Sequence, residues 1–98
     1  MLEYNRKTVF TSTGRTEWED VSWATEHAVY IETNAASSAV GQIETRMNGG
    51  TATAIVGSTF NSSAAVLLTQ ILSGHYDQLS VRLTESTGTV TVVMRGNS

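Results

Sequence analysis

Alternation of apolar and polar residues is the strongest pattern in this sequence, and it is clearest near the carboxyl end. Residues 79–85 and residues 89–95 each place apolar side chains at every second position, which is typical of strands with one face in a core. The run Ser86-Thr87-Gly88 between them is rich in turn-forming residues, so the two segments predict a β-hairpin. The predicted core face comprises Leu79, Val81, Leu83, Val90, Val92 and Met94.

Four segments further upstream follow the same period less strictly. Residues 7–11, 27–33, 39–47 and 51–56 are short and rich in β-branched or aromatic side chains. Between the last two, Asn48-Gly49-Gly50 supplies residues that tolerate positive φ, which predicts a second hairpin.

Residues 64–72 fit two patterns. Their apolar side chains recur at helical spacing, yet they also fit a strand whose two faces are both covered. The turn pair Ser73-Gly74 and the strong strand that follows favour the strand. Seven short strands in about one hundred residues predict an all-β chain with a single domain over residues 1–98. The predicted fold is an antiparallel β-sandwich, either jelly-roll-like or immunoglobulin-like.

The composition describes a surface that is neutral and rich in hydroxyl groups. Six Lys and Arg residues oppose nine Asp and Glu residues, so the net charge is -3 at pH 7. Charged residues make up 15% of the chain, against about 25% in an average globular protein. The 15 Thr and 11 Ser residues take their place. A neutral, hydroxylated surface loses little free energy when it is desolvated, which suits lasting protein contacts. The negative net charge argues against nucleic acid or an anionic membrane as a partner.

The usual devices that protect sheet edges are scarce. The chain has no proline and a single lysine, Lys7. A sandwich of 98 residues is also only marginally stable alone, and without cysteine it has no disulfide to add stability. One interpretation is drift in a small chain. The other is that the edges are covered in an assembly with copies of the same chain or with another protein.

Residues for catalysis or metal binding are few. His27 and His75 are the only histidines and share no ligand spacing, and the sequence has no Gly-x-Ser-x-Gly motif and no phosphate-binding loop. The longest apolar run, Ala64 to Leu68, is far shorter than the ~20 residues of a membrane helix. We therefore expect no catalytic residue, metal, cofactor, small-molecule substrate or membrane span, and a protein that is not an enzyme.

Four residues are candidates for binding a protein partner. Trp18 and Trp23 lie in a segment between two strands, where an indole either plugs the end of the sandwich or is presented to a ligand. Arg82 falls on the face of its strand that points away from the core, and Arg46 precedes the predicted Asn48 turn. If exposed, the tryptophans would serve as anchors and the arginines as ion-pairing groups.

The carboxyl-terminal quarter resembles a known class of proteins. The stretch from Gly74 to Thr84, GHYDQLSVRLT, and the strand TGTVTV from Thr87 to Val92 are similar to the closing hairpin of small β-sandwich virion proteins of tailed bacteriophages. The resemblance implies a structural protein of the virion that is assembled in the host cytoplasm. It would be a capsid decoration or cement subunit that contacts the major capsid protein, or else a neck or tail component. A carbohydrate-binding or adhesin module, with the tryptophans stacking on sugar rings, is the alternative from another class.

Overall fold

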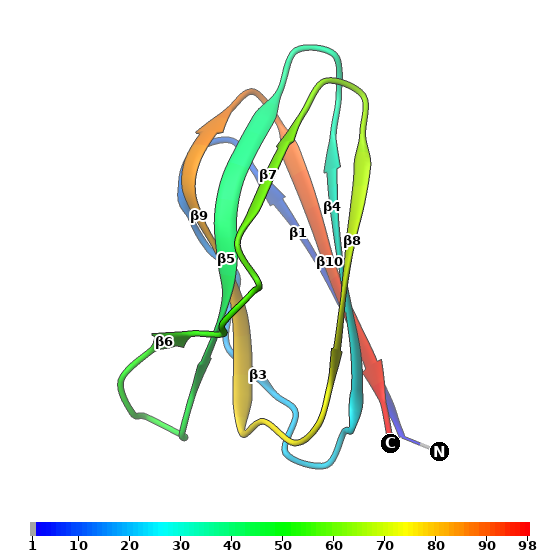
Figure 1. Cartoon of the computed structure of the whole chain (residues 1–98), viewed down its shortest axis with the longest axis vertical. Helices are drawn as coiled ribbons and strands as arrows, with labels where there is room; N and C mark the ends of the chain where they lie inside the picture. The colour runs from blue at the N-terminus through cyan, green and yellow to red at the C-terminus, as the bar shows by residue number, and fades with distance from the viewer. Residues whose placement is uncertain (1) are drawn as a thin grey trace.

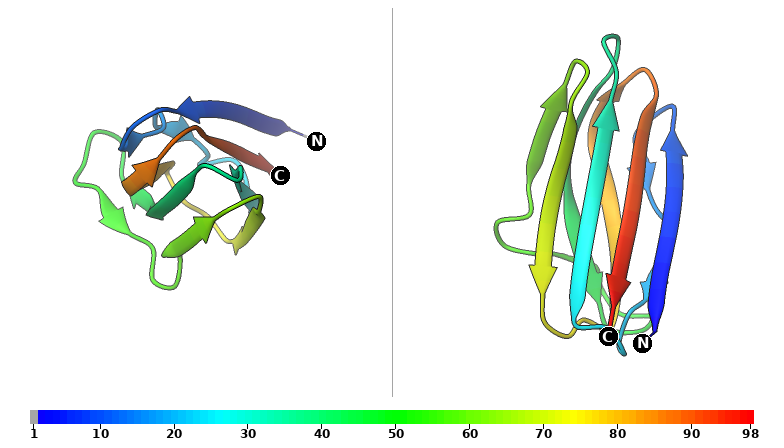
Figure 2. Two further views of the ribbon diagram at one scale, coloured as in Figure 1. Left: turned by 90° about the horizontal axis from the view of Figure 1, so that it is seen from above. Right: turned by 90° about the vertical axis from the view of Figure 1, so that its right-hand side faces the viewer.

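The protein folds into two antiparallel sheets packed face to face, as the computed structural model, which describes residues 2–98, shows in Figures 1 and 2. Residues 2–98 contain no helix, and so none that could cross a membrane. In chain order the strands are β1 (Glu3–Phe10), β2 (Gly14–Arg15), β3 (Glu19–Asp20), β4 (Glu26–Thr33), β5 (Ser38–Arg46), β6 (Thr53–Ala54), β7 (Phe60–Ser63), β8 (Leu67–Ser73), β9 (Gln78–Thr87) and β10 (Val90–Asn97).

The strand order selects the jelly-roll-like alternative. Sheet A has the order β1-β10-β4-β8, and sheet B places β9 and β5 at its centre, with β2 and β3 beside β9 and with β6 and β7 beside β5. The first strand therefore pairs with the last, β2 pairs with β9, β4 with β8 and β5 with β7, as in one long hairpin wound into two sheets. The predicted all-β sandwich is confirmed, with ten strands in the described residues rather than about seven, because β2, β3 and β7 are too short to show alternation.

The core lies between the sheets and consists of the faces that the alternation predicts. Burial of each such aliphatic side chain stabilises the fold by about 1.5–3 kcal/mol, which makes this contact the main source of stability in a chain without disulfides. Among the side chains exposed by no more than 1% are Val29, Ile31, Leu79, Val81, Leu83, Val90, Val92 and Met94.

The predicted hairpin of residues 79–95 is wrong. β9 pairs with β5, β2 and β3, whereas β10 pairs with β1 and β4, so the two strands belong to different sheets. The turn between them crosses from sheet B to sheet A (Figure 1). At its centre Gly88 has φ 67°, and a Cβ there would lie 2.8 Å from the carbonyl oxygen of Ala36. Alternation shows which face of a strand is buried, but it does not show which strand lies beside it.

The second predicted hairpin forms over only two residue pairs. β6 pairs with β5 at Glu44 and Thr45, and β7 then pairs with the first half of β5. Between them the buried Ser58 hydroxyl accepts the N–H of Ile43 at 3.1 Å and lies 2.7 Å from the Ile55 carbonyl oxygen, to which it donates. The Ile55 N–H still donates to the Ile43 carbonyl at 2.9 Å, but the Ser58 hydroxyl replaces the Ile55 carbonyl as the acceptor of the Ile43 N–H, and the ladder of the predicted strand of residues 51–56 ends there.

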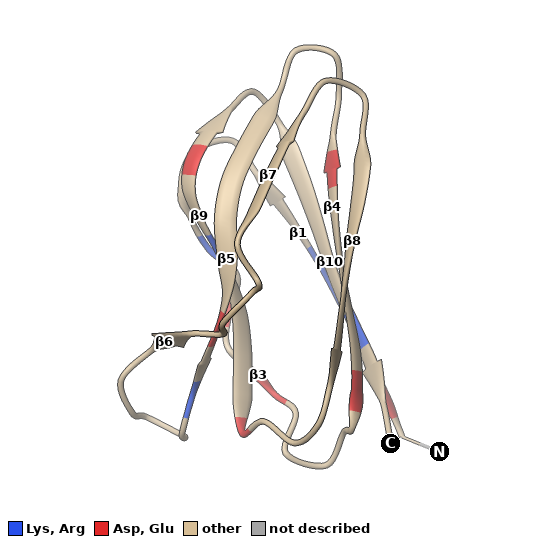
Figure 3. Cartoon of the chain, viewed as in Figure 1, with Lys and Arg blue, Asp and Glu red and all other residues tan. Residues whose placement is uncertain are grey.

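Residues 64–72 contain a strand, but the prediction that both its faces are covered is wrong. β8 lies at the edge of sheet A, and its outward side chains Leu67 and Ile71 are 59% and 65% exposed. Its inward side chains Leu68 and Leu72 pack against the core. β8 carries no charged residue (Figure 3).

Gly41 should be essential for the close packing of β5 against β7 and β9 within sheet B. The register of β5 against β9 shifts between Val40 and Gly41, and a Cβ at Gly41 would lie 2.2 Å from the Arg82 carbonyl oxygen and 2.8 Å from the Phe60 ring. Because the first of these atoms is backbone, no side-chain rotation relieves the clash. We expect Gly41→Ala to lower the free energy of unfolding by about 1–3 kcal/mol, measured by urea unfolding. The control Asn61→Ala, at an exposed position of β7, should change it by less than about 0.5 kcal/mol. Equal stability of the two variants would contradict this assignment.

Candidate functional site

A buried carboxylate organises the outer face of sheet B. Glu44 on β5 is only 3% exposed although its side chain points away from the core. Its oxygens accept hydrogen bonds from Gln42 at 2.5 Å and Arg15 at 2.6 Å, and Arg82 lies 3.7 Å away. Burial alone would raise the pKa of Glu44, but these hydrogen bonds and the two guanidinium charges outweigh burial and hold the pKa below its ordinary value. Glu44 is therefore ionised and paired.

Trp18 lies beside this carboxylate cluster. The guanidinium carbons of Arg15 and Arg46 lie 5.0 Å and 4.4 Å from the centre of its ring, within the range of cation–π contacts. Arg46 also donates to the side-chain oxygen of Gln78 at 2.8 Å. Three of the four predicted partner-binding residues, Trp18, Arg46 and Arg82, are thus brought together on one face. Their role in binding a partner stays a prediction.

Trp23, the fourth predicted residue, lies at the end of the sandwich. Its ring packs edge-on against Tyr4 at 5.9 Å and is half-buried against the core, which is the arrangement expected of a plug. The two tryptophans therefore contact different groups, Trp18 the arginines of the outer face and Trp23 the aromatic end of the core.

His27 forms part of that aromatic end. Its Nδ1 accepts the Tyr4 hydroxyl at 2.8 Å, and its Nε2 donates to the Gly74 carbonyl oxygen at 3.2 Å. Burial raises the pKa of Tyr4 far above its ordinary value, so the phenol keeps its proton and acts as the donor. Burial also lowers the pKa of His27, and the Gly74 carbonyl offsets this only in part. Both ring nitrogens of a neutral His27 are satisfied, which gives this residue a structural role.

The neutral state of His27 predicts a loss of stability in acid. Because its pKa is lower in the folded protein than in the unfolded chain, the unfolded chain binds the proton more readily, and the free energy of unfolding falls as the pH drops below about 6.5. We expect the urea midpoint of the wild type and of the control His75→Gln to fall between pH 7.5 and 5.5. In His27→Gln the part of this fall in the urea midpoint that comes from protonation of His27 should be absent. An equal pH slope in all three proteins would show that His27 does not control it.

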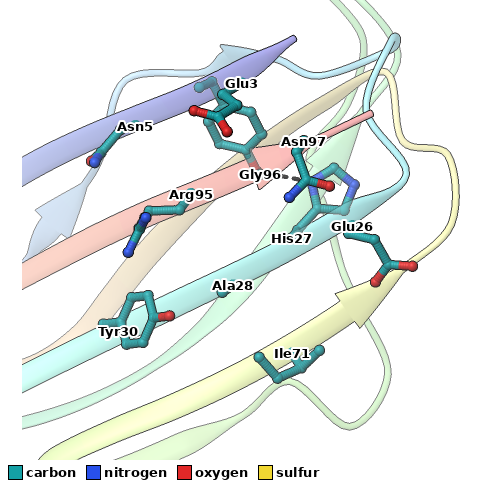
Figure 4. Close-up of a pocket in the computed structure, with 11 residues that line it drawn as sticks. Glu3, Asn5, Glu26, His27, Ala28, Tyr30, Ile71, Arg95, Gly96 and Asn97 are labelled. Atoms are coloured by element: carbon teal, nitrogen blue, oxygen red, sulfur yellow. Dashed lines mark hydrogen bonds between the residues drawn. The ribbon is translucent and has the colours of Figure 1, made fainter. Parts of the chain in front are cut away.

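A shallow hollow lies on the outer face of sheet A (Figure 4). It arises because Ala28 on β4 is small, whereas its neighbours in register, Arg95 on β10 and Ile71 on β8, are large. Tyr30, the next outward residue of β4, forms one wall, and the volume is about 520 Å³. Its polar lining comprises Glu3, Asn5, Glu26, Arg95 and Asn97.

Sequence reasoning missed this hollow. The outward residues that line it come from four strands that are far apart in the chain, and each occupies an ordinary outward position of an alternating pattern. The signal that could have found it is one tyrosine and one arginine on the outward faces of residues 27–33 and 89–95. Residues 2–98 bring no group of three or more His, Asp and Glu side chains within reach of one metal ion.

Comparisons with known proteins describe the fold rather than a family. No family model and no curated sequence matches the chain. Among solved structures, the SPBc2 prophage-derived protein YomS superposes with a TM-score of 0.68 at 17% identity, covering 100% of this chain and 96% of that protein. A structure of Bacillus endospore appendages, described as disulfide-linked pili, reaches a TM-score of 0.50 at 11% identity, covering 98% of this chain and 87% of that one. At these identities the likeness shows a shared all-β architecture.

Proposed function

We propose that the chain is a structural protein of a tailed-phage particle, and specifically a capsid decoration or cement subunit without enzymatic activity. The observation that carries this proposal is the match over nearly the whole of both chains to a prophage-derived protein of the same size. The resemblance of residues 74–92 to virion proteins supports it from the sequence. A neck or tail component of the virion is the variant nearest to this proposal.

The surface supports a role based on many weak protein contacts. Large apolar side chains are exposed at separate places, including the strand β1, the loops that flank β6 and the strand β8. On a symmetric shell each further contact forms at a high effective concentration, so no single contact needs to be strong. The exposed apolar residues are Leu2, Val9, Met47, Val56, Val66, Leu67 and Ile71.

Purified virions of the phage that encodes the chain test this function. Mass spectrometry should find the chain in many copies per particle, and particles made without it should bind the purified protein in a sedimentation assay. Trp18→Ala should weaken this binding about tenfold or more, since a half-buried tryptophan on an outer face suits an anchor. The control Tyr30→Ala, on the outer face of the other sheet, should bind like the wild type. Virions that lack the chain, together with no rebinding, would overturn the proposal.

A second candidate function is saccharide binding. The hollow on sheet A is a better site for a sugar than the two tryptophans, which contact other side chains of the protein. Tyr30 offers an aromatic wall, and the amides of Asn5 and Asn97 with the guanidinium of Arg95 offer hydrogen bonds to hydroxyl groups. On an array of bacterial surface glycans, a positive signal should be lost in Tyr30→Ala and kept in Trp18→Ala. No signal at millimolar protein concentration would exclude this function.

A further inference from the structure

β8 is the one long edge strand in the described residues that has none of the usual protection against pairing. It spans seven residues, LLTQILS, without a charge, a proline or a β-bulge. At the edges of sheet B, β2, β3 and β6 have two residues each and β7 has four. Very short edge strands offer little template for pairing, whereas a long, uncharged and apolar one offers a complete template.

β1, the opposite edge of sheet A, is protected by charge. Arg6 points inward and pairs with Glu19 of β3 at 2.5 Å and with Glu17 at 3.1 Å. Lys7 and Glu3 stand on the outward face of the same strand. Inward-pointing charges and an edge lysine are two devices by which sheet proteins prevent edge-to-edge association. Of the two edges of sheet A, only β8 is therefore open to pairing with another strand.

The free side of β8 presents a regular row of backbone groups. The Val66 carbonyl accepts from Thr33 and the Gly74 N–H donates to Thr25, so the backbone groups of even-numbered residues point toward β4. By alternation those of Leu67, Thr69, Ile71 and Ser73 point away from the sheet. The side chains of these same four residues are exposed. Both the hydrogen-bonding edge and the apolar outward face are therefore open to one partner strand.

We propose that two copies of this chain associate by antiparallel pairing of their β8 strands about a two-fold axis at Thr69. In this register Leu67 of one copy lies opposite Ile71 of the other, twice, with the two Thr69 residues facing each other at the axis. These are favourable cross-strand pairs, and the register places no charged side chain in the pairing strands. The two four-stranded sheets become one sheet of eight strands, within the size that twisted open sheets reach.

The strand itself identifies a second copy as the occupant. A two-fold interface requires one surface to be complementary to itself, and β8 meets this requirement because its outward apolar side chains, Leu67 and Ile71, are placed symmetrically around Thr69. Within residues 2–98 the other long edge strand, β1, carries three charged residues and is a poorer match for the uncharged edge of β8. The inference goes beyond the proposed virion function and does not depend on it, since the dimer would form with or without a capsid.

Sedimentation equilibrium of the purified chain tests the association. We expect a monomer–dimer equilibrium around the 10.5 kDa subunit, with a dissociation constant in the micromolar range, because one strand pair buries less than the roughly 1,200 Å² of a standard interface. Thr69→Lys places two like charges at the axis and should raise the dissociation constant at least about tenfold. The control Val9→Lys adds the same charge to an exposed position of β1 and should dimerise like the wild type.

Cysteine cross-linking tests the register in a chain that has no cysteine of its own. Directly opposite hydrogen-bonded residues have Cα atoms about 5.5 Å apart, which suits a disulfide. Thr69→Cys should therefore oxidise to a covalent dimer. Ser73→Cys, exposed on the same strand, would lie about 27 Å from its counterpart in this register and should stay monomeric. This second experiment stands even if Thr69→Lys perturbs folding.

The inference is overturned if the wild type is monomeric at millimolar concentration, if Thr69→Lys and Val9→Lys dimerise equally, or if Thr69→Cys and Ser73→Cys cross-link equally. Association of β8 with only another virion protein would also overturn it and would leave the proposed function intact. Conversely, if the purified chain dimerises through β8 but the chain is absent from virions, only the proposed virion function is overturned.

Discussion

Burial of the inward faces of the two sheets against each other is the interaction on which this structure depends. With no disulfide and only a few ion pairs, the chain relies on the packing of side chains such as Ile31, Val81 and Val92. That packing fixes the side chains on the inward face of every long strand. It leaves the outward half free, so the features that could serve binding all lie on outer faces or at edges.

The polar clusters show how the outer faces are stabilised without contributing to the core. On sheet B the buried Glu44 is neutralised by Arg15 and Arg82 and is flanked by Trp18, so a carboxylate on an outer face is held in one geometry. On sheet A a single small residue, Ala28, creates the hollow. In the first cluster the charge of Glu44 is paired within the chain, whereas the hollow on sheet A is open to solvent.

The jelly-roll order also determines which edges need protection. Winding one long hairpin into two sheets leaves four edges, and three of them are short or charged. The absence of proline and the single lysine suggested that the sheet edges were unprotected. In the structure only β8, among the edges of the described residues, is unprotected. The inward-pointing Arg6, paired with Glu19, protects β1, and the alternation of the sequence did not show that Arg6 points inward.

The sequence by itself determined the all-β class, most of the long strands and the side chains of the core, because alternation records which face of each strand avoids water. It also identified Trp18, Arg46 and Arg82 as unusual, although not that they meet around Glu44. Only the tertiary structure decided that β9 and β10 lie in different sheets, that β8 is an edge and that a hollow forms around Ala28. These properties depend on which strand lies beside which, and pairing between distant strands leaves no mark in the local pattern of either one.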